Sequence, residues 1–498
     1  MDKNTRKTAG AACELAYPGK EREEAVLASV DEALPLEPVK AFGPRRTAST
    51  AGNLLIYGDN LDGLKSLVME KRAGRLKNSD GSEGVRLVYI DPPFSTRLEF
   101  KGKKDQKAYN DKLVGADFVE FLRKRIILLK ELLAGDGSIF VHLDWKMAHH
   151  MKVVMDEVFG PENFLNDIIW SYGGRGAKAV AGQFSRNHDI ILWYRKKTHI
   201  FNQIFTERRV RKGEAGFRQD EQGRWFKTSP RGDYTDRSIA SLKEAGRIHE
   251  TRNGKIRIKY FLREDGDYII EDRLVGDVWD DIPDAMHLNA SEKTGYPTQK
   301  PEGLLRRIIL TATNEGDIVL DAFAGAGTTL AVAEKLGRRW IGIDSGKLSI
   351  HTIEKRLLTI KGTPDAKEPK KKYLKKYSPF SLMAAGDPGC AVAHGQSPAV
   401  KSRYSVDERT GECVIKIERF TSPEAKTAGI KGLDSLSCVM LDLGFDGRTF
   451  HLDNFYYADK LKELGYSVRF PQDKLRGEVL IIYADISGNE NWFVGDLS

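Results

Sequence analysis

The chain has little cysteine and no long apolar run. Its four cysteines, Cys13, Cys390, Cys413 and Cys438, form no Cys-x-x-Cys pair. That spacing suits neither a zinc site nor a disulfide framework, and it is typical of a reduced protein in the cytoplasm. No stretch of about 18 apolar residues occurs, so we expect no membrane span. The first residues, MDKNTRKTAG, lack the apolar segment of a secretory signal.

Charge is also far from extreme in either sign. Lys plus Arg number 79 against 71 for Asp plus Glu, which gives a net charge of +8. So mild an excess permits a polyanionic partner without identifying one. The 498 residues, 40% of them hydrophobic, leave room for two or three domains with real cores.

Strand-like apolar runs alternate with helical periodicity in two stretches of the chain. The predicted strands are 53–57, 85–90, 138–143, 167–170, 189–194, 318–321 and 340–344. Helical spacing appears at 118–133, after Pro301 and after Thr328. This alternation predicts an α/β fold with a largely parallel sheet.

The residue composition changes between and after these two stretches. From about residue 200 the apolar periodicity weakens, and arginines and lysines mingle with aromatic residues. A proline- and lysine-rich segment later precedes short strand-like runs separated by turn signals. We therefore expect an N-terminal extension (1–50), an α/β domain in two parts (51–200 and 291–362), an insert (201–290), a linker (363–400) and a small β-rich C-terminal domain (401–498).

The segment Asp91-Pro92-Pro93-Phe94 follows a predicted strand, where ligands bind in open α/β sheets. Prolines fix the backbone and hold their carbonyl oxygens at set angles. A carboxylate beside a rigid carbonyl gives two acceptors for an amine that carries two hydrogens, and the neighbouring aromatic ring can stack on a planar base. Taken alone, the segment fits a plain turn after a strand equally well.

A second segment, from Asp321 to Thr329, forms a strand-to-helix turn rich in glycine. Its glycines allow a ligand to approach the backbone closely. The turn lacks the Gly-Lys-Thr ending of a phosphate-binding loop, which argues against an NTPase. Asp344 ends the next strand, where it can accept hydrogen bonds from ribose hydroxyls. Phe323 within the turn and the missing third glycine disfavour the rival interpretation, a dinucleotide enzyme.

Together these motifs and Tyr296-Pro-Thr-Gln-Lys300-Pro301 resemble the amino-methyltransferases of DNA. The tetrad precedes the glycine turn, as in the circularly permuted β-class. Residues 163–194 and 279–283 are similar to the modification (Mod) subunits of type III restriction–modification systems. The resemblance covers about residues 53–362. It implies a Rossmann-like, S-adenosylmethionine-dependent methyltransferase fold, with 201–290 as the target-recognition insert.

The resemblance also implies roles for single residues. Asp91 and the carbonyl of Pro92, stiffened by Pro93, would hold the target amine, and Phe94 would stack on the base. Residues expected around the cofactor are Asp59, Thr298, Lys300, Asp321, Phe323, Gly325, Gly327, Thr328 and Asp344. Within the insert, the expected DNA contacts are Arg208, Arg211, Arg218, Arg224, Lys227 and Arg231. The family commonly has Tyr where Phe94 stands and His where Tyr296 stands.

An aspartate at the head of the tetrad goes with adenine N6 in this family, whereas serine goes with cytosine N4. We therefore predict transfer of a methyl group to adenine N6 in double-stranded DNA, after the base is flipped out of the duplex. A restriction (helicase/nuclease) subunit and a homodimer are the protein partners that the resemblance implies. Three alternatives remain: a cytosine-N4 enzyme, a methyltransferase acting on RNA or protein glutamine, and a catalytically silent DNA-binding subunit.

Overall fold

The computed structural model describes residues 13–44, 52–93, 99–101, 107–110, 115–172, 184, 186–288, 290–386, 397–427 and 429–496. The chain divides into two compact units: unit 1, residues 1–202 and 277–498, and unit 2, residues 203–276. Within the described residues, no helix is long and apolar enough to cross a membrane.

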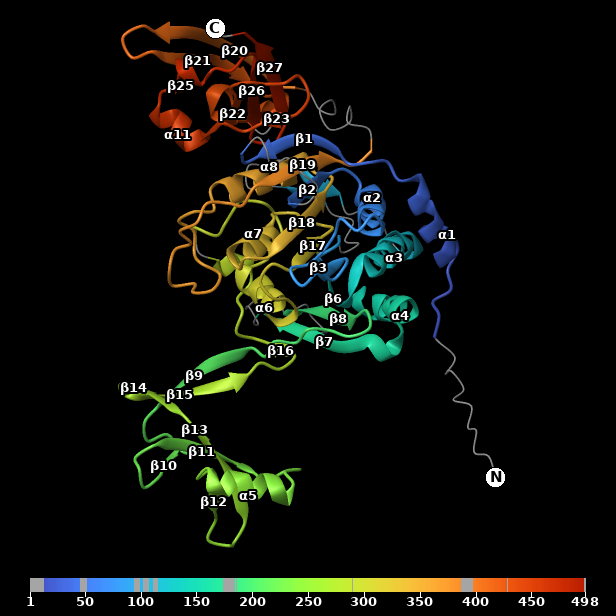
Figure 1. Ribbon diagram of the computed structural model, residues 1–498, viewed down its shortest axis with the longest axis vertical. Helices are drawn as coiled ribbons and strands as arrows, with labels where there is room; N and C mark the ends of the chain where they lie inside the picture. Colours follow the sequence, from blue (N-terminus) through green and yellow to red (C-terminus); the bar gives the residue numbers. More distant parts are fainter. Residues whose placement is uncertain are drawn as a thin grey trace. The chain divides into compact units, whose positions relative to one another are not determined.

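Unit 1 is built around one large mixed sheet (Figure 1). Its central strands are parallel and almost entirely buried, which is typical of a sheet covered on both faces. In spatial order, the described strands of this sheet are β16 (Val278–Trp279), β7 (Phe164–Ser171), β8 (His188–Arg195), β6 (Leu133–Leu143), β3 (Val85–Ile90), β17 (Ile318–Asp321), β18 (Arg339–Asp344), β2 (Asn53–Tyr57), β19 (Phe380–Ala384), β1 (Glu37–Phe42) and β23 (Phe450–His451).

The run from β6 to β19 is parallel throughout, while β8 is antiparallel to both of its neighbours and β1 is antiparallel to β19. The predicted α/β class is confirmed. The two sequence stretches contribute adjacent strands, because β3 of the first stretch pairs with β17 of the second. The tetrad and the glycine turn therefore follow neighbouring strands.

Helices pack on both sides of this sheet (Figure 1). On one side lie α1 (Glu23–Ala28), α2 (Asn60–Arg72), α3 (Gly115–Leu132) and α4 (Ala148–Phe159). The other side carries α6 (Glu302–Ala312) and α7 (Thr328–Lys335), and α8 (Lys347–Leu358) follows β18. The long helix α3 buries an apolar stripe that includes Phe118, Leu122 and Ile126, which is the periodicity that the sequence showed.

Three segments depart from the expected domain boundaries. Residues 363–400 are not simply a linker, because Phe380–Ala384 form β19, all five residues of which are buried in the large sheet. The expected N-terminal extension supplies β1. The insert ends earlier than residue 290, since Val278–Trp279 pair with β7 in unit 1. Strands of only two to six residues carry too little periodicity to stand out in sequence.

The C-terminal region is β-rich and has its own apolar cluster, but it belongs to unit 1. One of its sheets consists of β20 (Ala399–Asp407), β21 (Glu412–Thr421) and β25 (Ser467–Pro471). The other consists of β24 (Asn454–Tyr457), β22 (Leu436–Asp442), β26 (Val479–Asp485) and β27 (Glu490–Gly495). Two short helices, α10 (Pro423–Thr427) and α11 (Ala458–Glu463), complete it, and β23 reaches the large sheet.

Unit 2 contains two small antiparallel sheets and one helix, α5 (Asp236–Glu244). The three-stranded sheet consists of β14 (Arg263–Asp265), β15 (Tyr268–Leu274) and β9 (Phe205–Arg211). The four-stranded sheet consists of β10 (Arg218–Gln219), β11 (Trp225–Pro230), β13 (Ile256–Phe261) and β12 (Ile248–Glu250). A separate hairpin of unit 1 joins β4 (Glu99–Lys101) to β5 (Lys107–Asn110).

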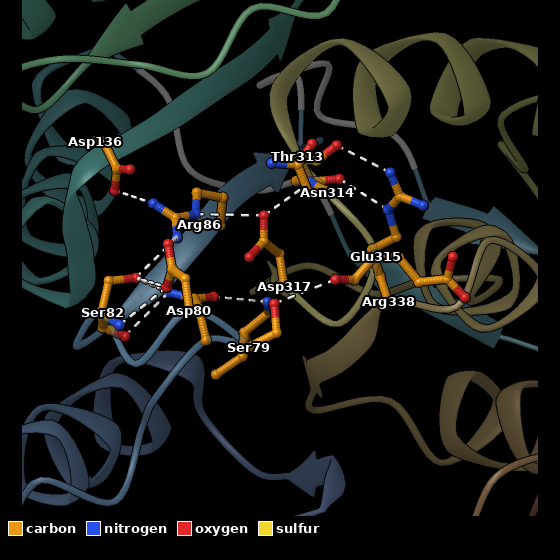
Figure 2. A network of polar contacts seen from close by, with 12 residues as sticks. Ser79, Asp80, Ser82, Arg86, Asp136, Thr313, Asn314, Glu315, Asp317 and Arg338 are labelled. Carbon is orange, nitrogen blue, oxygen red and sulfur yellow. Dashed lines mark hydrogen bonds and ion pairs between the residues drawn. The ribbon is translucent and has the colours of Figure 1, made fainter.

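A buried charge network ties the starting ends of β3, β6 and β17 together (Figure 2). The side chain of Arg86 is fully buried and forms ion pairs with Asp80 at 2.6 Å, with Asp317 at 3.3 Å and with Asp136. Removing one partner of such a cluster leaves an uncompensated buried charge, which is strongly destabilising. The network therefore fixes the strands at the end opposite to the tetrad and the glycine turn.

Candidate active site

One cavity of about 670 Å³ opens at the carboxyl ends of the parallel strands β2, β3, β17 and β18. Because parallel strands end at the same edge of a sheet, residues far apart in sequence meet there. Of the predicted site residues, the cavity is lined by Asp59, Asp91, Pro92, Pro93, Thr298, Lys300, Asp321, Phe323, Gly325, Thr328 and Asp344. Phe94 lies outside the described residues. The tetrad and the glycine turn thus share one cavity.

The carboxylate of Asp91 has two differently engaged oxygens. Lys300 Nζ donates to Oδ2 over 2.6 Å, and the two side chains are 13% and 18% exposed. Oδ1 is buried and has no hydrogen-bond partner within the described part of the chain. An unsatisfied buried acceptor is costly, so this oxygen is suited to a donor that arrives with a ligand. Lys300 was expected beside the cofactor; in the structure it contacts Asp91.

The glycine turn is held by carboxylates from two strands. Asp321 accepts hydrogen bonds from the amide of Phe323 at 3.0 Å and from Thr329 Oγ1 at 2.5 Å. Burial raises the pKa of Asp321 to about 7, although both hydrogen bonds lower it. Asp344 accepts from the amides of Gly325 and Gly346, each at 2.8 Å. Burial raises the pKa of Asp344 above its ordinary value.

Two glycines in this turn have backbone conformations that other residues rarely adopt. Gly325 has φ +49° and Gly327 has φ +69°. Gly327 precedes α7, and a Cβ atom there would lie 2.7 Å from Ile353 Cγ1. Gly327 thus contributes through the turn's shape and does not line the cavity. At Gly325 a Cβ would lie 3.6 Å from Tyr296, an ordinary contact, so the positive φ is what favours glycine there, and the residue lines the cavity.

Thr298 has φ +57°, an uncommon conformation for a residue with a side chain. The loop around it is fixed by Gln299, whose Oε1 accepts from the amide and hydroxyl of Thr294 at 2.9 and 2.8 Å. Thr328 Oγ1 donates to the carbonyl of Lys300 over 3.1 Å. Strained residues cluster at ligand sites when their surroundings hold them. This loop presents Thr298 and Lys300 to the cavity.

A buried arginine that the motifs did not single out connects α3 to the end of β2. Arg125 Nη2 donates to Asp59 over 2.8 Å and its Nε donates to Asn60, which in turn donates to the carbonyl of Ala322 over 2.7 Å. Burial lowers the pKa of Arg125 to about 10. Asp59 caps α2 by accepting from the amide of Leu61. One oxygen of Asp59 is therefore engaged in structure, although the residue lines the cavity as predicted.

A second set of residues that sequence reasoning missed crosses three neighbouring strands. The hydroxyl of Tyr89 on β3 lies 2.9 Å from Nδ1 of His142 on β6, and Nε2 of His142 lies 3.1 Å from Oδ2 of Asp189 on β8. The hydroxyl of Tyr89 can donate to Nδ1 of His142, and an N–H at Nε2 can donate to Asp189. Burial raises the pKa of Asp189, but the hydrogen bonds from His142 and Tyr172 and the nearby positive charge together outweigh burial, so the pKa lies below its ordinary value.

Asp189 and Tyr89 also line the cavity, together with the aromatic rings of Trp170 and Tyr172. These two rings stand edge to face with centroids 5.3 Å apart. Trp170 Nε1 donates to the carbonyl of Ile282 over 2.9 Å, which orients the indole. The cavity thus combines the carboxylates of Asp91 and Asp189 with aromatic rings. One sequence signal could have revealed this set of residues: the polar His142 follows the apolar run Ile139–Val141 within a predicted strand.

Among the six residues of unit 2 predicted to bind DNA, most already have partners within the unit. Arg208 pairs with Glu214 at 3.4 Å and Arg224 with Asp220 at 2.8 Å, while Lys227 and Arg231 form close ion pairs with Glu271 and Asp236. Arg218 contacts His249 at 3.1 Å, and Arg211 is exposed.

The chain was compared with known proteins. It matches the DNA methylase family N6_N4_Mtase over residues 85–355, more than half of its length. It is 31% identical over 374 residues to the type II methyltransferase M.EcaI of Enterobacter cloacae, covering 70% of this chain and 78% of that protein.

Two further relatives have informative names. The chain is 28% identical over 291 residues to the DNA adenine methyltransferase YhdJ of Escherichia coli K12, covering 58% of this chain and 77% of that protein. It is 27% identical over 381 residues to a Haemophilus influenzae protein named "Probable type III restriction-modification enzyme HindVI Mod subunit", covering 59% and 48%. The match thus spans about half of the Mod subunit.

The fold and the shared cavity are those of a Rossmann-like, S-adenosylmethionine-dependent methyltransferase. The chain belongs to the DNA methylase family and is an enzyme.

Proposed function

We propose that this enzyme transfers the methyl group of S-adenosylmethionine to N6 of an adenine in double-stranded DNA, as the modification component of a restriction–modification system. The observation that carries the proposal is the cavity in which Asp91 faces the same space as the glycine turn. One buried oxygen of Asp91 has no hydrogen-bond partner among the residues that the structure describes. Its volume, about 670 Å³, falls within the range of small-molecule sites.

The residues of the turn fit the cofactor. Gly325 lines the cavity, and the carboxylate of Asp344 is anchored by two backbone amides and can accept further hydrogen bonds from ribose hydroxyls. Phe323 and Thr328 line the same space. When bound, S-adenosylmethionine supplies a methyl group already activated by its sulfonium. The protein therefore has to align the acceptor amine and stabilise the charge that develops on it.

Asp91 performs that alignment. Its Oδ1 accepts one N–H of the exocyclic amine, and the carbonyl of Pro92 is the second acceptor. Lys300 holds Oδ2 and so fixes the carboxylate in one orientation. The negative charge of Asp91 stabilises the positive charge that forms on nitrogen. The flipped base lies in a cavity with aromatic walls, and stacking there offsets part of the few kcal/mol that unstacking costs.

Adenine is favoured over cytosine on two grounds. The tetrad begins with aspartate, and one relative is named as a DNA adenine methyltransferase. The similarity to a Mod subunit supports a restriction–modification context, a restriction subunit as a partner and a homodimer as the active form. A DNA substrate and the free thiols of Cys13, Cys413 and Cys438 support a location in the cytoplasm.

The test is to express the chain in a host without its own DNA methyltransferases and to sequence the host DNA with detection of modified bases. We expect N6-methyladenine at one short recurrent motif, and none in a host that expresses the Asp91→Ala variant. N4-methylcytosine at a recurrent motif would refute the choice of adenine. Unmodified DNA together with methylated RNA or protein would refute the DNA substrate.

A further inference from the structure

The four-stranded sheet of unit 2 has one face that is both basic and aromatic. Strand pairing places residues 218, 226, 228, 249, 257, 259 and 261 on the same face, because directly paired residues project to the same side. We call the following residues the basic-aromatic face: Arg218, Phe226, His249, Arg257, Lys259 and Phe261.

The members of this face contact one another across the strands. The rings of Phe226 and His249 lie 5.9 Å apart, and the ammonium of Lys259 lies 5.0 Å above the ring of Phe226. Arg218 reaches Nε2 of His249 at 3.1 Å. Next to the face, the guanidinium of Arg224 stacks 4.0 Å above Phe261, which is 36% exposed. The cations are thus held over aromatic rings at a partly exposed surface.

The opposite face of the same sheet is directed toward α5 and the core of unit 2. Ile258 on that face is fully buried, and Ile239 of α5 is 8% exposed. The hydroxyls of Tyr234, just before α5, and Tyr260 on the opposite face lie 3.5 Å apart. On the basic-aromatic face, Phe226 is buried beneath Lys259, whereas Arg218 is exposed and Arg257 and Lys259 are half-buried. The cations of this face are therefore accessible to a partner.

The cations of this face differ from those of the three-stranded sheet in their partners. Within the described residues, Arg218, Arg257 and Lys259 have no carboxylate within ion-pair distance. At the three-stranded sheet, by contrast, three cations are paired: Arg209 with Asp265 at 2.7 Å, Lys212 with Glu264 at 2.5 Å, and Arg263 with Glu207 at 2.8 Å and Asp272 at 2.7 Å. No carboxylate stands on the strand positions of the basic-aromatic face.

The cations of the basic-aromatic face also affect the pKa of His249. Burial lowers the pKa of His249, and so do the charges of Arg218, Lys259 and Arg257. An uncompensated cluster of cations attracts a polyanion and loses no internal ion pair when it binds one. The paired cations of the other sheet would first have to give up their carboxylates. Charge complementarity therefore favours DNA phosphates on the basic-aromatic face.

We propose that the basic-aromatic face is the surface by which unit 2 binds the phosphate backbone of double-stranded DNA. The proposal rests on the proposed function and refines it. It retains Arg218 from the residues predicted by sequence and adds Arg257 and Lys259. Arg208, Arg224, Lys227 and Arg231, which are paired with carboxylates, are assigned to the internal structure of unit 2.

The test compares two triple variants of the full chain that remove equal charge. The first carries Arg218→Gln, Arg257→Gln and Lys259→Gln, and the control carries Arg209→Gln, Lys212→Gln and Arg263→Gln. Binding to a fluorescent DNA duplex is measured over a range of salt concentrations. Loss of three phosphate contacts should reduce the salt slope by about 2.7 and weaken binding on the order of 10²-fold near 0.1 M salt. The control should stay within about threefold of the parent.

As a control for folding, thermal unfolding and cofactor binding are measured for both triple variants and for the parent. The charge-conserving pair Arg218→Lys and Arg257→Lys should retain the parental salt slope. If the parent methylates DNA, two results would overturn the assignment of this face. One is an equal loss of DNA affinity in both triple variants, and the other is parental DNA affinity in the first triple variant. A parent that neither binds nor methylates DNA would instead overturn the proposed function itself.

Discussion

Replacing Asp91 removes the acceptor that orients the target amine. Since Lys300 occupies Oδ2, only Oδ1 is available to the amine, so one charge-assisted hydrogen bond is lost. Loss of one such group from a preorganised site costs about 2.7–4 kcal/mol, or about 10²–10³ in kcat. Asp91→Ala also leaves the ammonium of Lys300, 13% exposed, beside a nitrogen that becomes positive.

We therefore expect Asp91→Ala to lower kcat by about 10³ or more, and Asp91→Asn, which keeps a neutral acceptor, by about 10². The assay is single-turnover transfer of labelled methyl groups to duplex DNA at saturating cofactor. The dissociation constant of the cofactor should change by no more than about threefold, because Asp91 acts on the acceptor.

A matched control is Asp459→Ala, which removes an exposed aspartate on α11 away from the cavity and should leave the rate unchanged. If Asp91→Ala transferred methyl groups at the parental rate, the assignment of the tetrad would be wrong. A large rise in the cofactor dissociation constant with an unchanged kcat would place Asp91 with the cofactor and refute the role in amine alignment.

Three further predictions concern the same cavity. Lys300→Met should lower kcat and leave cofactor affinity nearly unchanged. If titration calorimetry showed weaker cofactor binding while kcat stayed at the parental value, Lys300 would instead be a cofactor-binding residue. Asp344→Ala should weaken cofactor binding by about 10–100-fold, the worth of a charged hydrogen bond, and an unchanged dissociation constant would remove it from the ribose. The pKa of Asp321, about 7 against 3.8 for the free group, means that the folded state keeps a proton that the unfolded state has lost. Stability should therefore fall as pH rises from about 4 to 7, with a slope of up to about 1.4 kcal/mol per pH unit. Asp321→Asn should lack this loss in thermal unfolding between pH 5 and 8, whereas identical profiles would contradict the buried proton.

The sequence predicted those features that depend on residues close together in the chain. The glycine turn, the strand before it and the helix after it lie within about 20 consecutive residues, and their type follows from periodicity and turn chemistry. The tetrad could be assigned to the end of β3 for the same reason. The meeting of these two segments in one cavity follows from parallel pairing of β3 and β17.

Contacts between distant segments could not be predicted. Tyr89, His142 and Asp189 come together only through the register of β3, β6 and β8. In unit 2, the distinction between paired and unpaired arginines depends on which carboxylate stands across the strand. Arg209 and Arg257 both belong to basic strand segments of one insert, yet of these two only Arg209 has an acidic partner among the described residues. Single-sequence patterns carry no information on such partners.

The most direct test of the central claim uses purified protein, a duplex that contains its recognition motif, and S-adenosylmethionine with a deuterated methyl group. Mass spectrometry of the digested nucleosides identifies which atom has received the label. We predict deuterated N6-methyladenine, and none with Asp91→Ala. Label on cytosine, or the same yield of labelled adenine without the Asp91 carboxylate, would contradict the claim that this carboxylate holds an adenine amine opposite the cofactor.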